Sequence, residues 1–487
     1  MTKELRRISI LVLVMFLALF GSISWIQVVQ ADALAQNDAN RRTRLDSYEI
    51  QRGSIIAGGA PIATSVPSND MYSFQRVYTD PQMWSAVTGY YNPALGSATG
   101  IEKAMNSELS GTGGSQFLSS IERIISGQPQ KGANVVLTLD PVAQKAAYDA
   151  LQGYQGAVVA IEPKTGRILA LVSTPGFDTN SLAAHDSQAV NTTYDALVAD
   201  PNKPLSNRAI GGNMNPPGST FKLVVAAAAL DSGKFTMQST FPNPAAFTLP
   251  GTSTAVHNAW GGTCPGGDGQ NVSLADAIRY SCNIPMAELA VQLGDDAIRA
   301  AAEKFGFGQE FSLPLQSSAS TYPKNLSPDK TGLTGFGQGD VRATPLQMAM
   351  VSAGIANGGL VMNPRMVDQV VGDDLSVQKQ YENSQFRQAM TGDEAAAITA
   401  AMQASVSSGA AQGARIDGVD VAGKTGTAEN GDTDPYTLWF TGFAPASNPE
   451  IAVAVVVEDG GGQGQSGSGD TIASPIAKKV MEAVLNR

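Results

Sequence analysis

The order of apolar and polar positions divides the chain into an N-terminal span, a middle region without long periodic stretches, and a C-terminal region rich in predicted strands. An almost uninterrupted apolar run covers Ile8 to Val29, and basic residues precede it from Lys3 onward. A helix needs roughly 20 apolar residues to cross a bilayer, whereas a cleavable signal carries an apolar stretch of about 7–15. The run therefore predicts an uncleaved membrane anchor, with cleavage in the alanine-rich stretch 31–35 as the alternative.

Apolar runs separated by turn residues predict an antiparallel sheet in the C-terminal region. "GAVVAIEPKTGRILALVS" (156–173) reads as two strands joined by a turn at Pro-Lys-Thr-Gly. "YTLWFTGFAP" (436–445) and "IAVAVVVE" (451–458) read as successive strands, the second buried on both faces. The glycine-rich stretch 459–470 predicts a flexible loop before a C-terminal helix that starts at Ser474 and Pro475.

Composition limits the chemistry that is available. With 487 residues, two or three domains are expected, and 43% hydrophobic with 15% charged residues is ordinary for a globular protein. The net charge of −11 leaves no basic surplus for nucleic acid. Two histidines and two cysteines are too few for a structural zinc cluster, so we expect no metal and no cofactor.

Neither histidine is placed as a catalytic base. His185, in "LAAHDSQ", is predicted on an exposed helix, and His257 lies in a polar, glycine-flanked stretch that predicts a loop. A serine nucleophile in this chain would therefore need another base, and lysine is the plausible one.

The two cysteines, Cys264 and Cys282, could form one disulfide outside the cytoplasm. Their spacing does not show that they meet. A disulfide and two free thiols both stay open.

The stretch "GVDVAGKTGTAEN" (418–430) fits two motifs. From Gly418 it matches the phosphate-binding P-loop, and from Lys424 it matches Lys-Thr-Gly, a strand motif of penicillin-recognising serine enzymes. A P-loop needs a helix that begins at its lysine, but here Val-Asp-Val-Ala has a strand pattern and "GTAENGDTDP" follows. We therefore predict a strand and no nucleotide binding.

The Ser-x-x-Lys pattern occurs at Ser219–Lys222, Ser327–Lys330 and Ser376–Lys379. Ser219 follows Pro-Pro-Gly and begins an apolar helix over 221–230, where positions i and i+3 share a face. Its backbone N–H would lack an intrahelical partner and could hold an oxyanion. The second pair runs into a glycine-rich stretch with no predicted helix, and the third lies in a polar surface segment.

Ser-x-Asn occurs at Ser281–Asn283, and Lys-Thr-Gly occurs three times, at 164–166, 330–332 and 424–426. "VSLADAIRY" precedes Ser281 and predicts a short helix that Ser273 caps and Pro285 closes. Lys164 is predicted in a solvated turn, which leaves Lys424 as the candidate.

Taken in chain order, Ser219-Thr-Phe-Lys222, Ser281-Cys-Asn283 and Lys424-Thr-Gly-Thr427 resemble the motifs of penicillin-binding proteins. More narrowly, the chain resembles the class B, monofunctional transpeptidases and their actinobacterial A-type group. "RGSIIAGGAPIA" (52–63) looks like the family's Arg-Gly-x-Ile element, and 335–350 resembles the stretch between the second and third motifs. Too few residues precede Gly156 for the glycosyltransferase block of class A members.

The resemblance implies an α+β mixed fold, with a five-stranded antiparallel sheet flanked by helices and an all-helical subdomain. We predict a cytoplasmic tip and transmembrane anchor at 1–31, a non-catalytic pedestal at 32–150 and a transpeptidase domain at 151–487. The pedestal is loop-rich with short helices, and its fold is not predicted. Basic residues before the span favour a single-pass protein with its catalytic domain outside the cell, although Arg41, Arg42 and Arg44 follow the span.

The family's roles transfer as expectations. Ser219 would be the nucleophile, Lys222 the general base, and Ser281 the group that passes the proton to the leaving D-alanine. The backbone N–H groups of Ser219 and Thr427 would form the oxyanion hole. Substrate-binding roles are expected as follows: Asn283 for the acyl-side amide, Lys424 for positive potential, Thr425 and Thr427 for the carboxylate, and Gly426 for a bare strand edge.

The implied function is cross-linking of peptidoglycan stem peptides that end in D-Ala-D-Ala, through a serine acyl-enzyme that β-lactams trap. A role in cell-wall synthesis during division or shape maintenance follows, with a membrane glycosyltransferase and divisome or elongation proteins as possible partners. A D,D-carboxypeptidase, a serine β-lactamase or β-lactam sensor, and a non-catalytic wall-assembly scaffold are the alternatives.

Overall fold

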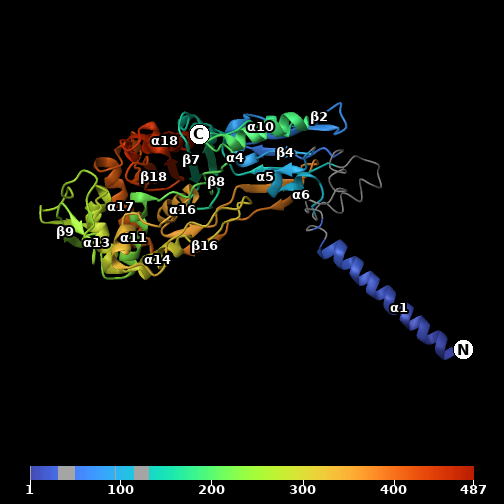
Figure 1. The fold of residues 1–487 in the computed structure, drawn as a ribbon, viewed down its shortest axis with the longest axis horizontal. Coiled ribbons are helices and arrows are strands. Elements are labelled where there is room, and N and C mark those ends of the chain that lie inside the picture. The colour runs from blue at the N-terminus through green and yellow to red at the C-terminus, as the bar shows by residue number, and fades with distance from the viewer. Residues whose placement is uncertain (1, 31–33, 35–49, 94, 114–130, 487) are drawn as a thin grey trace.

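A computed structural model describes residues 2–30, 34, 50–93, 95–113 and 131–486. Helix α1 (Thr2–Ser24) continues into a π-helical turn, η1 (Trp25–Val29), and stands away from the rest of the molecule (Figure 1). Lys3–Val29 is long and apolar enough to cross a membrane, and its apolar side chains are exposed. Of the alanine-rich stretch 31–35 only residue 34 is described. The arginines at 41, 42 and 44 lie outside the described residues.

The centre of the C-terminal region is a five-stranded sheet in which every neighbouring pair is antiparallel. In sheet order its strands are β17 (Ala422–Ala428), β18 (Thr437–Ala444), β19 (Ile451–Val457), β7 (Gly156–Ile161) and β8 (Ile168–Thr174). The predicted hairpin and the two predicted strands are confirmed. All residues of β7, β8, β18 and β19 are buried, because helices cover both faces of the sheet.

Helices α8 (Pro141–Ala150) and α18 (Ser474–Leu485) pack together on one face of this sheet, and α18 starts at Ser474 as predicted. Helix α16 (Pro345–Ala356) covers the other face and is buried along almost its whole length. Helix α11 (Lys222–Asp231) is apolar on all sides and therefore lies within the core between neighbouring helices.

The predicted helical subdomain is present, but short strands interrupt it. Two corrections concern its turns: Pro285 lies in the first turn of the next helix instead of closing the previous one, and Ser327 begins a short helix where none was predicted. Ser273 caps its helix as predicted, by accepting a hydrogen bond from the Asp276 amide. The helices are α12 (Leu274–Arg279), α13 (Ile284–Leu293), α14 (Asp295–Lys304), α15 (Pro328–Thr334) and α17 (Gly392–Ser408). The paired strands are β9 (Thr240–Pro242) with β12 (Asn271–Ser273), β10 (Phe247–Thr248) with β11 (Ala255–Val256), and β13 (Leu360–Met362) with β16 (Gln385–Gln388).

The N-terminal region contains a six-stranded sheet that the sequence patterns did not predict. Two of its strands, β14 and β15, come from the chain beyond residue 366, although the predicted boundary places them in the transpeptidase domain. In order the strands are β15 (Val377–Gln380), β14 (Val367–Val371), β6 (Asn134–Leu137), β1 (Ile55–Ala57), β2 (Ala60–Pro67) and β3 (Phe74–Tyr78). The remaining elements beside it are α4 (Pro81–Thr88), β4 (Tyr91–Asn92), β5 (Ser97–Ala98), α5 (Gly100–Ala104), α6 (Asn106–Leu109), α9 (Thr179–Ala183) and α10 (Ser187–Ala199). One continuous apolar core joins this region to the helices beside the central sheet.

The Arg-Gly-x-Ile element lies at a buried ion-pair network in this region. Arg52 Nε donates to Glu102 Oε2 at 2.5 Å, and Arg76 Nε donates to Glu102 Oε1 at 2.6 Å. All three side chains are almost fully buried. Gly53 is required by close packing, since a Cβ there would lie 1.9 Å from the Ala133 carbonyl oxygen.

Burial by itself raises the pKa of Glu102, but the charges of Arg76 and Arg52 outweigh it and the pKa is lowered. The stabilisation by this carboxylate is therefore present at neutral pH and is lost only as acid protonates it, below its ordinary pKa.

We expect Glu102→Gln to lower the free energy of unfolding by about 3–5 kcal/mol, because two buried guanidinium groups would lose their counter-charge. Urea unfolding with hydrogen exchange of β1–β3 measures this loss. Glu382→Gln at an exposed position is the control. Equal stability of the two variants would contradict the account.

Candidate active site

Ser219 lies in a 3₁₀ turn, η3 (Gly218–Phe221), that leads directly into α11. Backbone amides in such a first turn lack intrahelical partners. Gly218 has φ +52°, and a Cβ on it would lie 3.2 Å from the Ala428 nitrogen and the Thr427 carbonyl carbon. The start of the turn therefore packs against the Thr427 peptide, and a glycine is needed for both the conformation and the approach.

The Lys222 amine lies among groups of the Ser-x-Asn motif. Its Nζ donates to the Ser281 carbonyl oxygen at 2.7 Å, to Asn283 Oδ1 at 2.8 Å and to Ser281 Oγ at 3.5 Å. The Ser219 hydroxyl, three residues away along the chain, is not among its hydrogen-bond partners. In enzymes without bound substrate, the hydrogen bond between a base and its nucleophile is often long or absent, and it tightens only when substrate binds.

Lys424 approaches the same hydroxyl from the sheet. Its Nζ donates to Ser281 Oγ at 2.6 Å and to the Thr425 carbonyl oxygen at 2.9 Å. Ser281 itself has φ +63°, a conformation that costs a non-glycine residue energy and is often found at functional positions. Two amines from distant segments thus meet at one hydroxyl.

Both lysine side chains are fully buried, and this controls their protonation. Burial and then the charge of Lys424 hold the pKa of Lys222 well below its ordinary value. Burial also lowers the pKa of Lys424 to about 7. Burial and the neighbouring charge thus favour the neutral form of the Lys222 amine, which is the form a general base needs.

The Ser-x-Asn segment is held by the loop that precedes it. The Asn283 amide donates to Asn258 Oδ1 at 2.8 Å, and Asn283 Nδ2 donates to the His257 carbonyl oxygen at 3.0 Å. The structure joins Cys264 to Cys282, whose Cα atoms are 5.7 Å apart. The middle residue of the motif is therefore tied to this loop by a covalent bond, and Asn258 is a supporting residue that no sequence motif identified.

Strand β17 is an edge strand of the five-stranded sheet, so one of its two edges does not pair with another strand of that sheet. Thr427 Oγ1 accepts a hydrogen bond from the Gly469 amide, which leaves its own proton for another acceptor. Thr425 Oγ1 instead donates to the Ala410 carbonyl oxygen at 3.1 Å. A Cβ on Gly426 would lie 2.9 Å from the Pro217 carbonyl oxygen, so this glycine lets the strand approach the turn of Ser219.

The rejected motif copies lie elsewhere in the fold. Ser376 and Lys379 are on or beside the exposed edge strand β15, and Lys164 is exposed in the turn between β7 and β8, as predicted. Ser327 stands at the N-cap position of α15 without a side-chain capping hydrogen bond, and Lys330 lies in that helix and is exposed. None of these lysines is a partner of the Ser281 hydroxyl.

Neither histidine approaches the two lysines. His257 is exposed, and its Nδ1 lies 3.2 Å from the Ala245 carbonyl oxygen. The prediction for His185 was wrong: it lies in a bend between α9 and α10, where it is half-buried beside Asp70. Its partner Asp70 is distant in sequence, so the local pattern around His185 could not reveal this half-buried position. In the described residues, groups of His, Cys, Asp and Glu that could hold a metal ion are absent.

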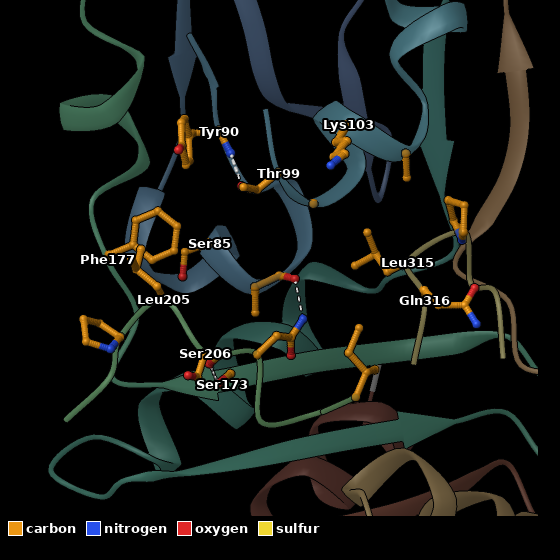
Figure 2. Close-up of a pocket in the computed structure, with 18 of the residues that line it drawn as sticks. Ser85, Tyr90, Thr99, Lys103, Ser173, Phe177, Leu205, Ser206, Leu315 and Gln316 are labelled. Atoms are coloured by element: carbon orange, nitrogen blue, oxygen red, sulfur yellow. Dashed lines mark hydrogen bonds between the residues drawn. The ribbon is translucent and has the colours of Figure 1, made fainter. Parts of the chain in front are cut away.

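A cavity of about 590 Å³ lies apart from these groups, between the N-terminal region and the central sheet. Tyr90, Phe177 and Leu315 line it with Lys103 among other residues (Figure 2). Its Ser173 hydroxyl donates to the Ser206 carbonyl oxygen, so this polar group is already satisfied within the protein. None of the predicted site residues lines this cavity.

Comparison with known proteins decides the family. Residues 156–482 match the model of the penicillin binding protein transpeptidase domain, and residues 52–135 match that of the penicillin binding protein A dimerisation domain. This chain belongs to the penicillin-binding protein transpeptidase family. The predicted resemblance and the predicted mixed fold are thereby confirmed.

Relatives in this family align over the whole chain. Peptidoglycan D,D-transpeptidase PbpA of Mycolicibacterium smegmatis is 39% identical over 100% of this chain and 99% of its own length. PbpA of Mycobacterium tuberculosis is 38% identical with the same coverage. The structure of M. tuberculosis penicillin-binding protein A as a ceftriaxone acyl-enzyme complex has a TM-score of 0.87 at 38% identity, covering 91% of this chain and 100% of that one. A D,D-transpeptidase domain from Eggerthella lenta has a TM-score of 0.77 at 32% identity and covers 90% of this chain and 99% of that one.

The lysine pKa values predict a bell-shaped pH profile for acylation by penicillin. The rate should fall in acid as Lys222 is protonated, and it should fall above a pH of about 7 as Lys424 loses its charge. Lys424→Arg keeps a cation at all these pH values, so it should remove the alkaline fall even if the maximum rate is lower. Rate constants of acylation across pH 5–10 measure both limbs. An unchanged alkaline fall in the arginine variant would assign that limb to another group.

Proposed function

We propose that this protein is a peptidoglycan D,D-transpeptidase that works through an acyl-enzyme on Ser219. The observation that carries the proposal is the meeting of two buried amines, Lys222 and Lys424, at the Ser281 hydroxyl beside the turn of Ser219. Relatives at 38–39% identity over the full length are named D,D-transpeptidases, and M. tuberculosis penicillin-binding protein A has been solved as β-lactam acyl-enzymes.

In the acylation step, Ser219 Oγ attacks the carbonyl carbon between the two terminal D-alanines of a stem peptide. The neutral Lys222 amine takes the hydroxyl proton. The oxyanion is held by the backbone N–H groups of Ser219 and Thr427, and loss of one such donor costs about 2.7–4 kcal/mol. The C–N bond then breaks, and the proton reaches the departing D-alanine amine through Ser281.

Substrate is held along the free edge of β17. Asn283 binds the acyl-side amide, and the Lys424 charge attracts the terminal carboxylate. The Thr427 hydroxyl donates to that carboxylate, because its own proton is free. Thr425 has a smaller part than the sequence suggests, since its hydroxyl donates to Ala410.

The acyl-enzyme ends when the amine of a second stem peptide attacks the ester and releases Ser219. A β-lactam enters by the same attack, and its ester persists because the opened ring stays attached and blocks the acceptor. A D,D-carboxypeptidase would share the first step and give the acyl group to water. The names of the full-length relatives favour transfer.

The protein is anchored in the cell membrane by α1, with the catalytic domain outside the cell. Residues 1–31 form the cytoplasmic tip and anchor, 32–150 the pedestal and 151–487 the transpeptidase domain, with β14 and β15 completing the pedestal sheet. Glycan strands come from a membrane glycosyltransferase within a division or elongation complex. The orientation is tested by adding protease to intact cells whose protein carries a C-terminal tag. Loss of the tag is expected if the catalytic domain lies outside the cell.

Labelling with a fluorescent penicillin tests the nucleophile and the base. We expect full labelling of the native protein, none with Ser219→Ala, and loss at neutral pH with Lys222→Ala, whose fold should persist because alanine suits a buried helix. Ser327→Ala is the matched control for the rejected motif and should label normally. Normal labelling of the Lys222 variant would show that another group is the base.

A second assay separates transfer from hydrolysis. Lipid-linked precursor is polymerised by an added glycosyltransferase, and an amine acceptor such as glycine or a D-amino acid is supplied. We expect the acceptor to replace the terminal D-alanine in products that Ser219→Ala does not form. Release of D-alanine with no acceptor incorporated would make the protein a carboxypeptidase. If penicillin labels the protein normally but neither product forms, both the transpeptidase and the carboxypeptidase activity on this precursor are excluded.

A further inference from the structure

Glu458 follows the last residue of β19 and points into the segment that leads to Ser219. Its Oε1 accepts hydrogen bonds from Asn215 Nδ2 at 2.9 Å and Asn213 Nδ2 at 3.2 Å. Its Oε2 accepts from Arg208 Nε at 2.9 Å and Gln155 Nε2 at 2.8 Å. The side chain is buried, and its carboxylate joins three polar side chains of the stretch 208–215 to Gln155.

The two asparagines that share Oε1 lie on either side of a strained residue. Met214 has φ +53°, a conformation that non-glycine residues adopt at a cost and that persists only where the surroundings hold it. Glu458 Oε1 binds the side chain before Met214 and the side chain after it. The carboxylate therefore clamps this turn in its unfavourable conformation.

The clamped turn continues directly into the nucleophile. The Asn215 carbonyl oxygen accepts from the Ala343 amide at 3.0 Å, and the Pro216 carbonyl oxygen accepts from Trp439 Nε1 at 2.9 Å. The Gly218 amide then donates to the Gly337 carbonyl oxygen at 3.2 Å. These later contacts are neutral hydrogen bonds, whereas the clamp before them ends on a charged acceptor, which binds more strongly.

Arg208 keeps this acceptor charged. It lies in an ion pair with Glu458 Oε2, and its Nη2 donates to the Asn202 carbonyl oxygen at 2.7 Å. Burial raises the pKa of Glu458, but hydrogen bonds from Asn215 and Arg208 together with the Arg208 charge outweigh it and lower the pKa. The carboxylate is thus ionised at neutral pH and accepts from both asparagines.

We propose that Glu458 is a positioning residue for acylation: by holding Asn213 and Asn215 around the strained Met214, it sets the turn that presents the Ser219 hydroxyl to the Lys222 amine. The proposal rests on the proposed function, because it assumes that Ser219 is the residue acylated. Glu458 does not touch the reacting atoms; it acts through the backbone of residues 213–218.

The test uses the full-length protein in detergent micelles and the rate constant of acylation by a fluorescent penicillin. In Glu458→Gln an amide nitrogen would face hydrogen-bond donors at one of the two positions, so one pair of contacts is lost. We expect the rate constant to fall about tenfold or more, and Asn215→Ala to give a similar fall. Gln155→Ala removes a partner of the other oxygen and should stay within about twofold of the native rate.

A rescue separates positioning from a general loss of stability. Glycine adopts positive φ without steric cost. Adding Met214→Gly to the Glu458→Gln protein should therefore raise its acylation rate constant by at least about threefold. The labelled fraction reports how much protein is folded, and the rate constant reports the geometry of the folded site.

An unchanged rate constant in Glu458→Gln, a lower labelled fraction with a native rate constant, or a slow variant that Met214→Gly does not rescue would each overturn the proposal. Failure of the native protein to label would instead overturn the proposed function, so the two failures are distinct.

Discussion

Two lysine amines buried around one serine hydroxyl set the constraint on which the site depends. Lys222 and Lys424 both donate to Ser281 Oγ, from a helix and from a sheet edge respectively. Two positive charges this close together in a buried site would repel strongly. The pair therefore favours the state in which only one of the two amines is protonated. The lowered pKa of Lys222 favours its neutral form, and we propose that this amine accepts the proton while Lys424 attracts the substrate carboxylate.

Backbone packing brings these groups together, and glycine makes it possible. Gly218, Gly337 and Gly426 come from three separate segments, and a Cβ at any of them would collide with, or crowd, the backbone of another of these segments. The candidate catalytic groups thus lie on a turn, a helix start and a sheet edge that pack against one another. The N-terminal region shares one apolar core with the helices beside this sheet.

Much of the site could be predicted because its motifs are local. A serine and a lysine three positions apart at a helix start, and a lysine on a strand without a following helix, are visible in sequence alone. The pedestal sheet could not be predicted, since its strands are short and two of them, β14 and β15, come from far along the chain. Glu102, Asn258 and Glu458 were missed for the same reason: each is one polar residue whose partners are distant in sequence. His185 was misplaced because its environment is set by Asp70 on another element.

The protonation state of Lys222 tests the central claim most directly. Lysine labelled with ¹³C at Cε gives a chemical shift that follows the charge of each amine, and Lys222→Arg identifies the signal by its loss. We predict that the pKa of this amine lies well below 10.5, the ordinary value for lysine, because the side chain is buried beside Lys424. A Lys222 signal that remains that of a charged amine up to the ordinary range would contradict the account.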